Sequence, residues 1–272
     1  MITALGPALL FCPADRPDRY DKAVDRADTV ILDLEDAVSP AAKDGARQAV
    51  AAALPRLGPD VLVRVNAADT PWFADDIAML RAAGHLAVML PKVDSPADLD
   101  PLDGFRVLAI CETAAGVLAA PAIARHTACA AIMWGGEDLI ADLGGRSSRN
   151  PAGRYYPLVE HARFTVLLAA GAAGKVAVDS VHIDIADLDG LARESAEAAD
   201  VGFAAKACIH PSHVSVIRRA FRPTDESIAW AQRVTAAART AAGVFRFEGR
   251  MIDEPLLRQA QATLQRADPP AH

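Results

Sequence analysis

Cysteine is scarce in this chain, and none of its cysteines is spaced as a metal or redox motif. The four are Cys12, Cys111, Cys129 and Cys208, with no CxxC pair and no zinc-ligand spacing among them. This pattern argues against a zinc ribbon or a disulfide scaffold, and we expect reduced core cysteines rather than a catalytic thiol. Because no signal peptide is recognisable, the expected location is cytoplasmic.

Basic charge and long apolar runs are also scarce. The chain has 28 lysines and arginines against 35 aspartates and glutamates, a formal net charge of −7. Because nucleic-acid binding needs a basic face, we expect no nucleic-acid partner. No apolar run approaches the roughly 20 residues that a membrane-spanning helix needs, so we expect no membrane partner either.

The usual nucleotide-binding motifs are absent. No GxGxxG follows the first predicted strand and no GxxxxGK[ST] occurs, which removes the strongest argument for an open nucleotide-binding sheet. Instead, short apolar runs alternate with helix-like segments, and such runs are typical of parallel strands covered on both faces. They predict an α/β fold, the (β/α)8 TIM barrel, with strands in residues 8–14, 29–36, 61–66, 85–93, 106–113, 130–138, 177–184 and 204–211.

The segment after the last predicted strand is longer than a plain barrel needs. We predict a barrel domain over residues 1–222 and a C-terminal helical extension over residues 223–272. The extension would be a cap over the barrel, an oligomer arm, or both. In this region we expect helices over residues 212–221, 224–242 and 255–266, with an irregular segment over 244–253.

Three of the predicted strands deliver charge only at their carboxyl ends, in the form of Arg64, Glu112, and Glu137 with Asp138. A charge buried alone is costly, so each of these must be paired, bound to a metal or open to a cleft. Glu112 and Asp138 end neighbouring strands of the barrel, and two carboxylates so placed suit Mg²⁺, which leaves its other positions to water and substrate. Carboxylates that cap helices or form salt bridges are the alternative, and Glu137 could replace Asp138.

The second predicted strand ends in the sequence DLED, and one of Asp33, Glu35 and Asp36 should face the barrel mouth. Arg64 could grip a carboxylate or a thioester oxygen, or it could pair with Glu35 or Asp36. Lys92 could form a Schiff base, although a salt bridge to a strand-end acid is the commoner use of such a lysine.

Two further groups of basic residues are candidates for binding. Arg16 and Lys22 make the first loop and helix locally basic, and they could bind a phosphorylated cofactor or form a solvated helix face. Arg146, Arg149 and Arg154 lie in a loop rich in glycine and serine that could be a mobile lid.

Motifs along nearly the whole chain resemble the citrate lyase β-subunit-like branch of the HpcH/HpaI aldolase/citrate lyase family. They occur in family order, and several independent motifs agree. The matching segments are FCPADRP (11–17), ILDLEDAVSPAAKDGAR (31–47), VRVN (63–66), MLPKV (89–93), ICET (110–113), WGGEDL (134–139), CIHP (208–211) and FEGRMIDEP (247–255).

The resemblance implies a homotrimeric or hexameric barrel that uses Mg²⁺ and acts on CoA thioesters. It implies Glu112 and Asp138 as metal ligands, choosing Asp138 over Glu137, and Arg64 and Glu112 as catalytic, substrate-binding residues. Asp253 would be a catalytic residue that reaches a neighbouring subunit's site, on which the C-terminal extension would pack as a lid. The resemblance also implies that Gly135, Gly136 and Asp36 bind substrate, and that Arg16 and Lys22 bind the CoA moiety.

The implied reaction is the cleavage or formation of a 3-hydroxyacyl-CoA thioester of the citryl-, malyl- or citramalyl-CoA kind. Its products would be acetyl-CoA or a homologue and a 2-keto acid such as oxaloacetate or pyruvate. Two alternatives remain open: a CoA-independent, metal-dependent pyruvate-type aldolase, and a non-catalytic subunit of a citrate lyase-like complex. An intact set of Arg64, Glu112, Asp138 and Asp253 argues against the non-catalytic subunit.

Overall fold

The structure, a computed structural model, describes residues 5–58, 60–241 and 243–267. The chain divides into two compact units, Met1–Arg218 and Arg219–His272. The sequence had suggested a boundary a few residues later, between residues 222 and 223.

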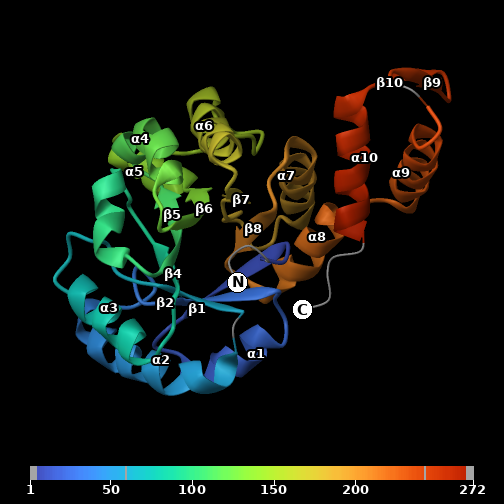
Figure 1. Cartoon of the computed structure of the whole chain (residues 1–272). Helices are drawn as coiled ribbons and strands as arrows, with labels where there is room; N and C mark the ends of the chain where they lie inside the picture. Colours follow the sequence, from blue (N-terminus) through green and yellow to red (C-terminus); the bar gives the residue numbers. More distant parts are fainter. Residues whose placement is uncertain (1–4, 59, 242, 268–272) are drawn as a thin grey trace. The chain divides into compact units, whose positions relative to one another are not determined.

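The first unit is a closed barrel of eight parallel strands in sequential order. Figure 1 shows its helices lying outside the strands. The predicted (β/α)8 fold is therefore confirmed, although every strand is shorter than its apolar run. The strands are β1 (Ala8–Pro13), β2 (Thr29–Asp33), β3 (Val61–Arg64), β4 (Ala87–Leu90), β5 (Arg106–Cys111), β6 (Cys129–Trp134), β7 (Val176–Asp179) and β8 (Ala205–Cys208).

Apolar side chains fill the inside of this barrel. The buried cluster takes residues from alternate positions of neighbouring strands, because successive side chains of a strand point to opposite faces. β1 and β8 close the ring, with Leu9 opposite Ala207. The interior cluster comprises Leu9, Ile31, Leu62, Ala87, Met89, Leu108, Ile110, Ala131, Met133, Val178, Ala205 and Ala207.

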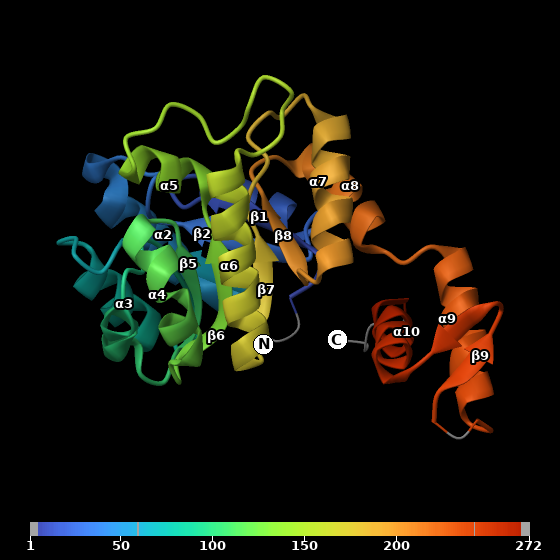
Figure 2. The same cartoon turned by 90° about the horizontal axis from the view of Figure 1, so that it is seen from above.

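Helices connect most of the strands and cover the barrel. The helix between β3 and β4 was missed by the sequence analysis, and the crossover from β4 to β5 is the short 3₁₀ segment Pro96–Leu102. The helices are α1 (Tyr20–Val24), α2 (Lys43–Leu57), α3 (Phe73–Ala82), α4 (Ala114–Arg125), α5 (Gly136–Asp142), α6 (Pro157–Ala173), α7 (Leu188–Val201) and α8 (Pro211–Phe221). A long connection joins α5 to α6 and arches toward α7 (Figure 2).

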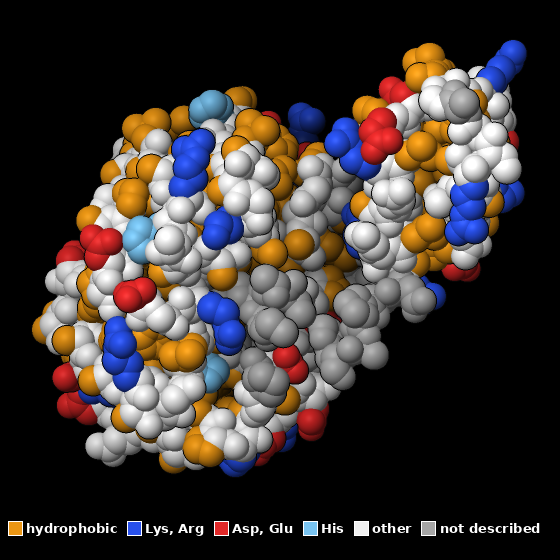
Figure 3. Space-filling view, viewed as in Figure 1, with side chains coloured by type: hydrophobic (Ala, Val, Ile, Leu, Met, Phe, Trp, Pro, Cys, Tyr) orange, Lys and Arg blue, Asp and Glu red, His pale blue; other side chains and the backbone are white. Residues whose placement is uncertain are grey.

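The surface of the barrel unit mixes both signs of charge. On the face shown in Figure 3, basic side chains are dispersed among acidic and apolar ones rather than gathered in one broad area. Among the described residues, no helix is long and apolar enough to span a bilayer.

Beyond the end of α8, the described residues of the second unit form two helices and a hairpin. α9 (Asp225–Ala238) and α10 (Glu254–Ala267) enclose a small core of Ala231, Val234, Ile252 and Ala260. Between them, β9 (Phe245–Phe247) pairs antiparallel with β10 (Arg250–Ile252), so the prediction of an irregular segment over 244–253 was wrong.

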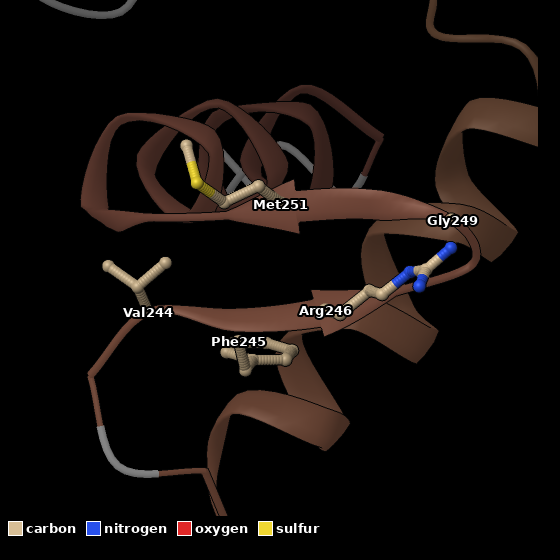
Figure 4. A pocket seen from close by; sticks show the side chains of 5 residues that line it. All are labelled: Val244, Phe245, Arg246, Gly249 and Met251. Atoms are coloured by element: carbon tan, nitrogen blue, oxygen red, sulfur yellow. The ribbon is translucent and has the colours of Figure 1, made fainter.

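The turn of this hairpin explains why it forms. Its two central residues, Glu248 and Gly249, have φ values of 46° and 80°, the left-handed pair that fits a tight hairpin. Figure 4 shows a pocket at the hairpin, lined by Val244, Phe245, Arg246, Gly249 and Met251. This pocket has no carboxylate in its lining, so it does not have the ligands of a Mg²⁺ site.

Candidate active site

The carboxyl ends of β2 to β6 bring the predicted charged residues to the barrel mouth. Cys111 of β5 lies opposite Trp134 of β6, so the next residues, Glu112 and Gly135, lie side by side. In the same way Asp33 ends β2 directly opposite Arg64, which ends β3. Strand register therefore places Glu112 beside Gly135, and Asp33 beside Arg64, at one end of the barrel.

Glu112 is a buried carboxylate, only 4% exposed. Its Oε1 accepts a hydrogen bond of 3.0 Å from the backbone N–H of Lys92. Burial, together with the negative charges of Asp138 and Glu35, raises the pKa of Glu112 to about 8, and Arg64 opposes the shift. A carboxylate in this state gains most from a nearby cation, because the cation removes both the burial cost and the repulsion.

Gly135 leaves the space that this carboxylate occupies. A Cβ at position 135 would lie 2.7 Å from Glu112 Oε2 and 2.8 Å from its Cβ, closer than van der Waals contact permits. A Cβ at Gly136 would lie 3.0 Å from the Trp134 ring. The two glycines therefore let the chain turn from β6 into α5 while it touches the Glu112 carboxylate.

Asp138 and Glu137 both lie in the first turn of α5, but their surroundings differ. Glu137 Oε1 accepts hydrogen bonds from Ser148 Oγ at 2.6 Å and from Arg149 Nη1 at 2.9 Å. Asp138 is partly buried. In the described part of the chain, no group donates a hydrogen bond to its carboxylate or forms an ion pair with it. Of the two neighbours, Asp138 is thus the carboxylate that remains available for a cation.

The pair Glu112 and Asp138 is small for a metal site. In residues 5–58, 60–241 and 243–267 there is no group of three or more His, Cys, Asp or Glu placed to hold a metal. Two carboxylates still fit Mg²⁺, which commonly takes one or two from the protein and completes its shell with water and substrate oxygens. They do not fit structural zinc, which takes four protein ligands.

Arg64 is held by two acids at the end of β2. Its Nε and Nη2 donate to the Asp33 carboxylate at 2.7 and 2.6 Å, and its Nη1 lies 2.9 Å from Glu35 Oε2. Its guanidinium also lies over the Phe11 ring, 4.8 Å from the centroid. Pairing with Glu35 was one of the two predicted roles of Arg64, whereas Asp33 was not expected as its partner.

Lys92 forms ion pairs with Glu35 and, at 3.6 Å, with Asp36. Although burial opposes it, the contacts with Glu35 and Asp36 raise the pKa of Lys92. A lysine that stays protonated is a poor nucleophile, so the salt-bridge alternative is confirmed over the Schiff base. Asp33 and Glu35 are buried, whereas the Asp36 side chain is 60% exposed.

Arg16 and Lys22 are less constrained. Arg16 pairs with Asp18 at 3.0 Å on the surface after β1, and Lys22 is exposed on α1. Their predicted contact with CoA stays a prediction.

The four cysteines are buried and free, and burial raises the pKa of Cys12 and Cys129 to about 11 and that of Cys208 to about 12. Such thiols are poor nucleophiles, as expected for core residues.

A second polar cluster was missed by the sequence analysis. Asp179, at the end of β7, is fully buried and binds Lys206 Nζ at 2.8 Å and Arg163 Nε at 3.0 Å. Trp134 Nε1 donates to the same carboxylate at 2.8 Å. The only sequence signal was an aspartate and a lysine inside apolar runs, and their pairing depends on β7 and β8 lying side by side.

Two family models match this chain. A model of the carbon–carbon bond lyases of the TIM-barrel fold matches residues 157–269, and the HpcH/HpaI aldolase/citrate lyase model matches residues 8–211. With the closed barrel and the strand-end carboxylates, these matches define the class as a TIM-barrel carbon–carbon lyase. The chain belongs to the HpcH/HpaI aldolase/citrate lyase family, as its motifs indicated.

Curated relatives match almost the whole chain. The citrate lyase subunit beta-like protein of Mycobacterium tuberculosis (strain H37Rv) is 48% identical over 267 residues, or 98% of this chain and 97% of the relative. The mitochondrial citramalyl-CoA lyase of Homo sapiens is 33% identical and aligns with 94% of this chain and 84% of its own length.

Solved structures agree with this assignment. The CitE protein of M. tuberculosis in complex with magnesium, acetoacetate and coenzyme A has a TM-score of 0.92 at 48% identity, covering 97% of this chain and 98% of that one. The citrate lyase beta subunit of M. tuberculosis complexed with oxaloacetate and magnesium has a TM-score of 0.79 at 48% identity, covering 82% and 99%.

Proposed function

We propose that this protein is a Mg²⁺-dependent lyase that cleaves, or in reverse forms, a 3-hydroxyacyl-CoA thioester. The products would be acetyl-CoA or a homologue and a 2-keto acid of the oxaloacetate or pyruvate kind. The observation that carries the proposal is the pair of carboxylates at the mouth, the buried Glu112 and Asp138, whose carboxylate has no partner among the described residues. The relatives complexed with magnesium, coenzyme A and oxaloacetate support it.

Glu112 and Asp138 would hold the metal. Glu112 Oε1 is oriented by the Lys92 N–H, and Oε2 lies against Gly135, facing the strand end that delivers Asp138. When bound, Mg²⁺ supplies Lewis-acid stabilisation of charge on substrate oxygens. The repulsion between the two carboxylates, evident in the raised pKa of Glu112, is the property of this chain that favours a cation between them.

Arg64 would bind the thioester end of the substrate. Its guanidinium is fixed by Asp33 and Glu35, so it needs little reorganisation to face a developing negative charge on the thioester oxygen. A donor aimed in this way is typically worth about 3–4 kcal/mol, or ~10²–10³ in rate. Gly135, Gly136 and Asp36 would line the substrate's path, and Arg16 and Lys22 would contact the CoA phosphates.

Asp253 would move a proton at the acyl carbon of a neighbouring subunit's substrate. It lies between β10 and α10, where its Oδ1 accepts a hydrogen bond of 3.3 Å from the Leu256 N–H. This role requires an oligomer, for which we propose a homotrimer or hexamer with the C-terminal unit as the exchanged lid.

The buried, free cysteines are consistent with a reducing, cytoplasmic location.

The experiment that tests the function is a panel of citryl-, malyl- and citramalyl-CoA with Mg²⁺, with products identified by mass. Formation of a short acyl-CoA and a keto acid supports the lyase. Calorimetric titration with CoA distinguishes the CoA-independent aldolase, which would turn over pyruvate and an aldehyde without binding CoA. Binding without turnover of any thioester would point instead to a non-catalytic subunit.

A further inference from the structure

The short segment from Trp134 to Asp138, which carries the second of the two proposed metal carboxylates, is fastened at both ends to one buried polar network. At its start, Trp134 Nε1 donates to Asp179 Oδ1 at 2.8 Å, and both residues are fully buried. At its end, Glu137 accepts from Ser148 and Arg149. Gly135, which touches Glu112, and Asp138 therefore lie on a clamped stretch of chain.

Arg149 joins the second of these anchors to the network. Its Nε and Nη2 donate to the two carboxylate oxygens of Glu194 on α7, at 3.1 and 3.2 Å. Its Nη2 also donates to Tyr155 Oη at 2.6 Å, and its guanidinium lies 4.1 Å from the centroid of the Tyr155 ring. The forked guanidinium of Arg149 thus binds Glu137 and Glu194 at once. A lysine ammonium could not replace it in both contacts.

Glu194 ties this hub to the strands of the barrel. Its Oε2 lies 3.0 Å from His182 Nδ1 and 3.6 Å from Lys206 Nζ, and Lys206 pairs with Asp179. Despite the opposing effect of burial, His182, Lys206 and Arg149 lower the pKa of Glu194 to about 2. Glu194 is thus charged at any working pH, and the network runs continuously from Asp179 to Glu137.

The loop that contains Arg149 is therefore anchored rather than free. It lies in the connection from α5 to α6, which arches toward α7 in Figure 2. Arg149 is only 11% exposed, and Ser148 beside it is 1% exposed. The sequence of this loop suggested a mobile lid, and that prediction does not fit the part of the loop around Arg149 and Ser148.

Asp138 lies in the first turn of a short helix, α5. α5 has only seven residues, and so short a helix has little stability of its own. Asp138 follows Glu137 directly, and no other group holds its carboxylate among the residues that the structure describes. The Arg149–Glu137 contact is thus one of the external constraints on this helix, beside the Ser148–Glu137 bond, the Ala114 N–H bond to Asp142 and the packing of Leu139, and it is the one that acts next to Asp138.

We propose that Arg149 is a positioning residue that sets where Asp138 lies relative to Glu112, acting through Glu137. This inference rests on the proposed function, since it assigns Arg149 to the same metal site. Groups that orient metal ligands in this way typically change metal affinity by about 10–100-fold when they are altered.

The test is the dissociation constant for Mg²⁺, measured by calorimetry on the full-length protein without substrate. Two variants carry it: Glu137→Gln, which keeps an acceptor for Ser148 but loses the charge, and Arg149→Lys, which keeps the charge but loses the fork. Each should weaken Mg²⁺ binding by about 10-fold or more. Wild-type affinity in both variants would overturn the proposal.

Two controls separate positioning from general loss of stability. Arg154→Gln lies in the same loop, where the Arg154 side chain is exposed, and it should leave Mg²⁺ affinity unchanged. Val50→Ala removes methyl groups from the fully buried Val50 on α2, and it should lower the melting temperature without altering Mg²⁺ affinity. Equal weakening in Val50→Ala and Arg149→Lys would overturn the proposal, because instability alone would explain the loss.

The double variant tests the route through Glu137. If Arg149 acts through Glu137, Glu137→Gln combined with Arg149→Lys should weaken binding no more than the stronger single variant. If the losses of Mg²⁺ affinity in the two single variants multiplied in the double variant, this route through Glu137 would be contradicted. Failure of the proposed function is distinguishable, because the wild-type protein would then bind no Mg²⁺ in the same titration.

Discussion

The backbone N–H of Lys92 donates a hydrogen bond to Glu112 Oε1 from a left-handed conformation, with φ at 51°. Such a conformation costs a non-glycine residue about 1–3 kcal/mol and persists only when its surroundings enforce it. The Lys92 ammonium meanwhile pairs with Glu35, which also contacts Arg64. Lys92 therefore contacts the Glu112 carboxylate through its backbone and Glu35, the partner of Arg64, through its side chain.

Lys92→Met separates these two contacts, because it removes the ammonium and keeps the N–H. The Lys92 side chain is 38% exposed, so solvent screens its ion pairs and we expect a stability loss of only about 1 kcal/mol. Mg²⁺ affinity should change little. Chemical denaturation and calorimetry measure the two quantities, and complete loss of Mg²⁺ binding would mean that the side chain, not the N–H, orients Glu112.

Gly135→Ala should displace the Glu112 carboxylate, because the added Cβ would lie 2.7 Å from Oε2. Overpacking of this kind costs roughly 1–3 kcal/mol, and Mg²⁺ binding should weaken along with stability. The matched control is Gly171→Ala on α6, where a Cβ meets nothing within 4 Å. That control should be neutral or stabilising by up to about 1 kcal/mol. Equal Mg²⁺ affinity in both variants would show that position 135 has room to spare.

The raised pKa of Glu112 predicts how stability depends on pH in the metal-free protein. An acid whose pKa rises on folding, here from 4.5 to about 8, stabilises the fold while it is protonated. This contribution is complete below about pH 4.5 and is lost as the pH rises through about 8. Urea unfolding from pH 5 to 9 in EDTA should therefore show a fall that is smaller in Glu112→Gln. An identical pH profile for the variant would contradict the raised pKa.

Mg²⁺ should reverse this dependence, because it binds the deprotonated carboxylate. Affinity for Mg²⁺ should rise with pH up to about 8, and binding should release protons. Calorimetry in two buffers of different ionisation enthalpy measures that release.

The Arg64–Asp33 pair makes a separate prediction about stability. Arg64→Met would leave Asp33 and Glu35 buried without their arginine, and losing one partner of a buried ion pair costs about 3–5 kcal/mol. Asp33→Asn should cost less in the Arg64→Met background than in the wild type. A double-mutant cycle of unfolding free energies measures this coupling, and additive losses would show that the pair contributes nothing beyond its two parts.

Asp253 is tested by subunit mixing. Inactive Arg64→Ala chains and inactive Asp253→Ala chains, mixed under subunit exchange, should recover part of the wild-type activity if Asp253 serves a neighbouring subunit. Neither variant alone should recover. Absence of recovery in mixtures that demonstrably exchange subunits would contradict the trans role of Asp253.

The barrel and its strand-end charges could be predicted because both depend on local patterns. Continuous apolar runs predict parallel strands, and a charge after such a run must lie at the mouth, as Glu112 and Arg64 do. The hairpin of β9 and β10 was missed because its strands are three residues long and its turn uses Glu248, a residue that seldom adopts positive φ. α3 was missed between two strands that were correctly placed.

Side-chain pairing could not be read from the sequence in the same way. Which acid of DLED holds Arg64 depends on register, since Asp33 lies directly opposite Arg64 across two strands. The network of Asp179, Lys206, Glu194 and Arg149 joins residues that are up to 57 positions apart, and only the closed barrel brings them together. Periodicity indicates where a charge lies along a strand, but it does not identify its partner.

The central claim is that Glu112 and Asp138 hold the Mg²⁺ on which thioester cleavage depends. The most direct measurement is the rate of keto-acid release from the preferred hydroxyacyl-CoA, with Mg²⁺ and with EDTA, for the wild type, Glu112→Gln and Asp138→Asn. We predict Mg²⁺-dependent release by the wild type, loss of that activity in EDTA, and rates at least about 100-fold lower in both variants. Wild-type rates in EDTA, or in either variant, would contradict the account.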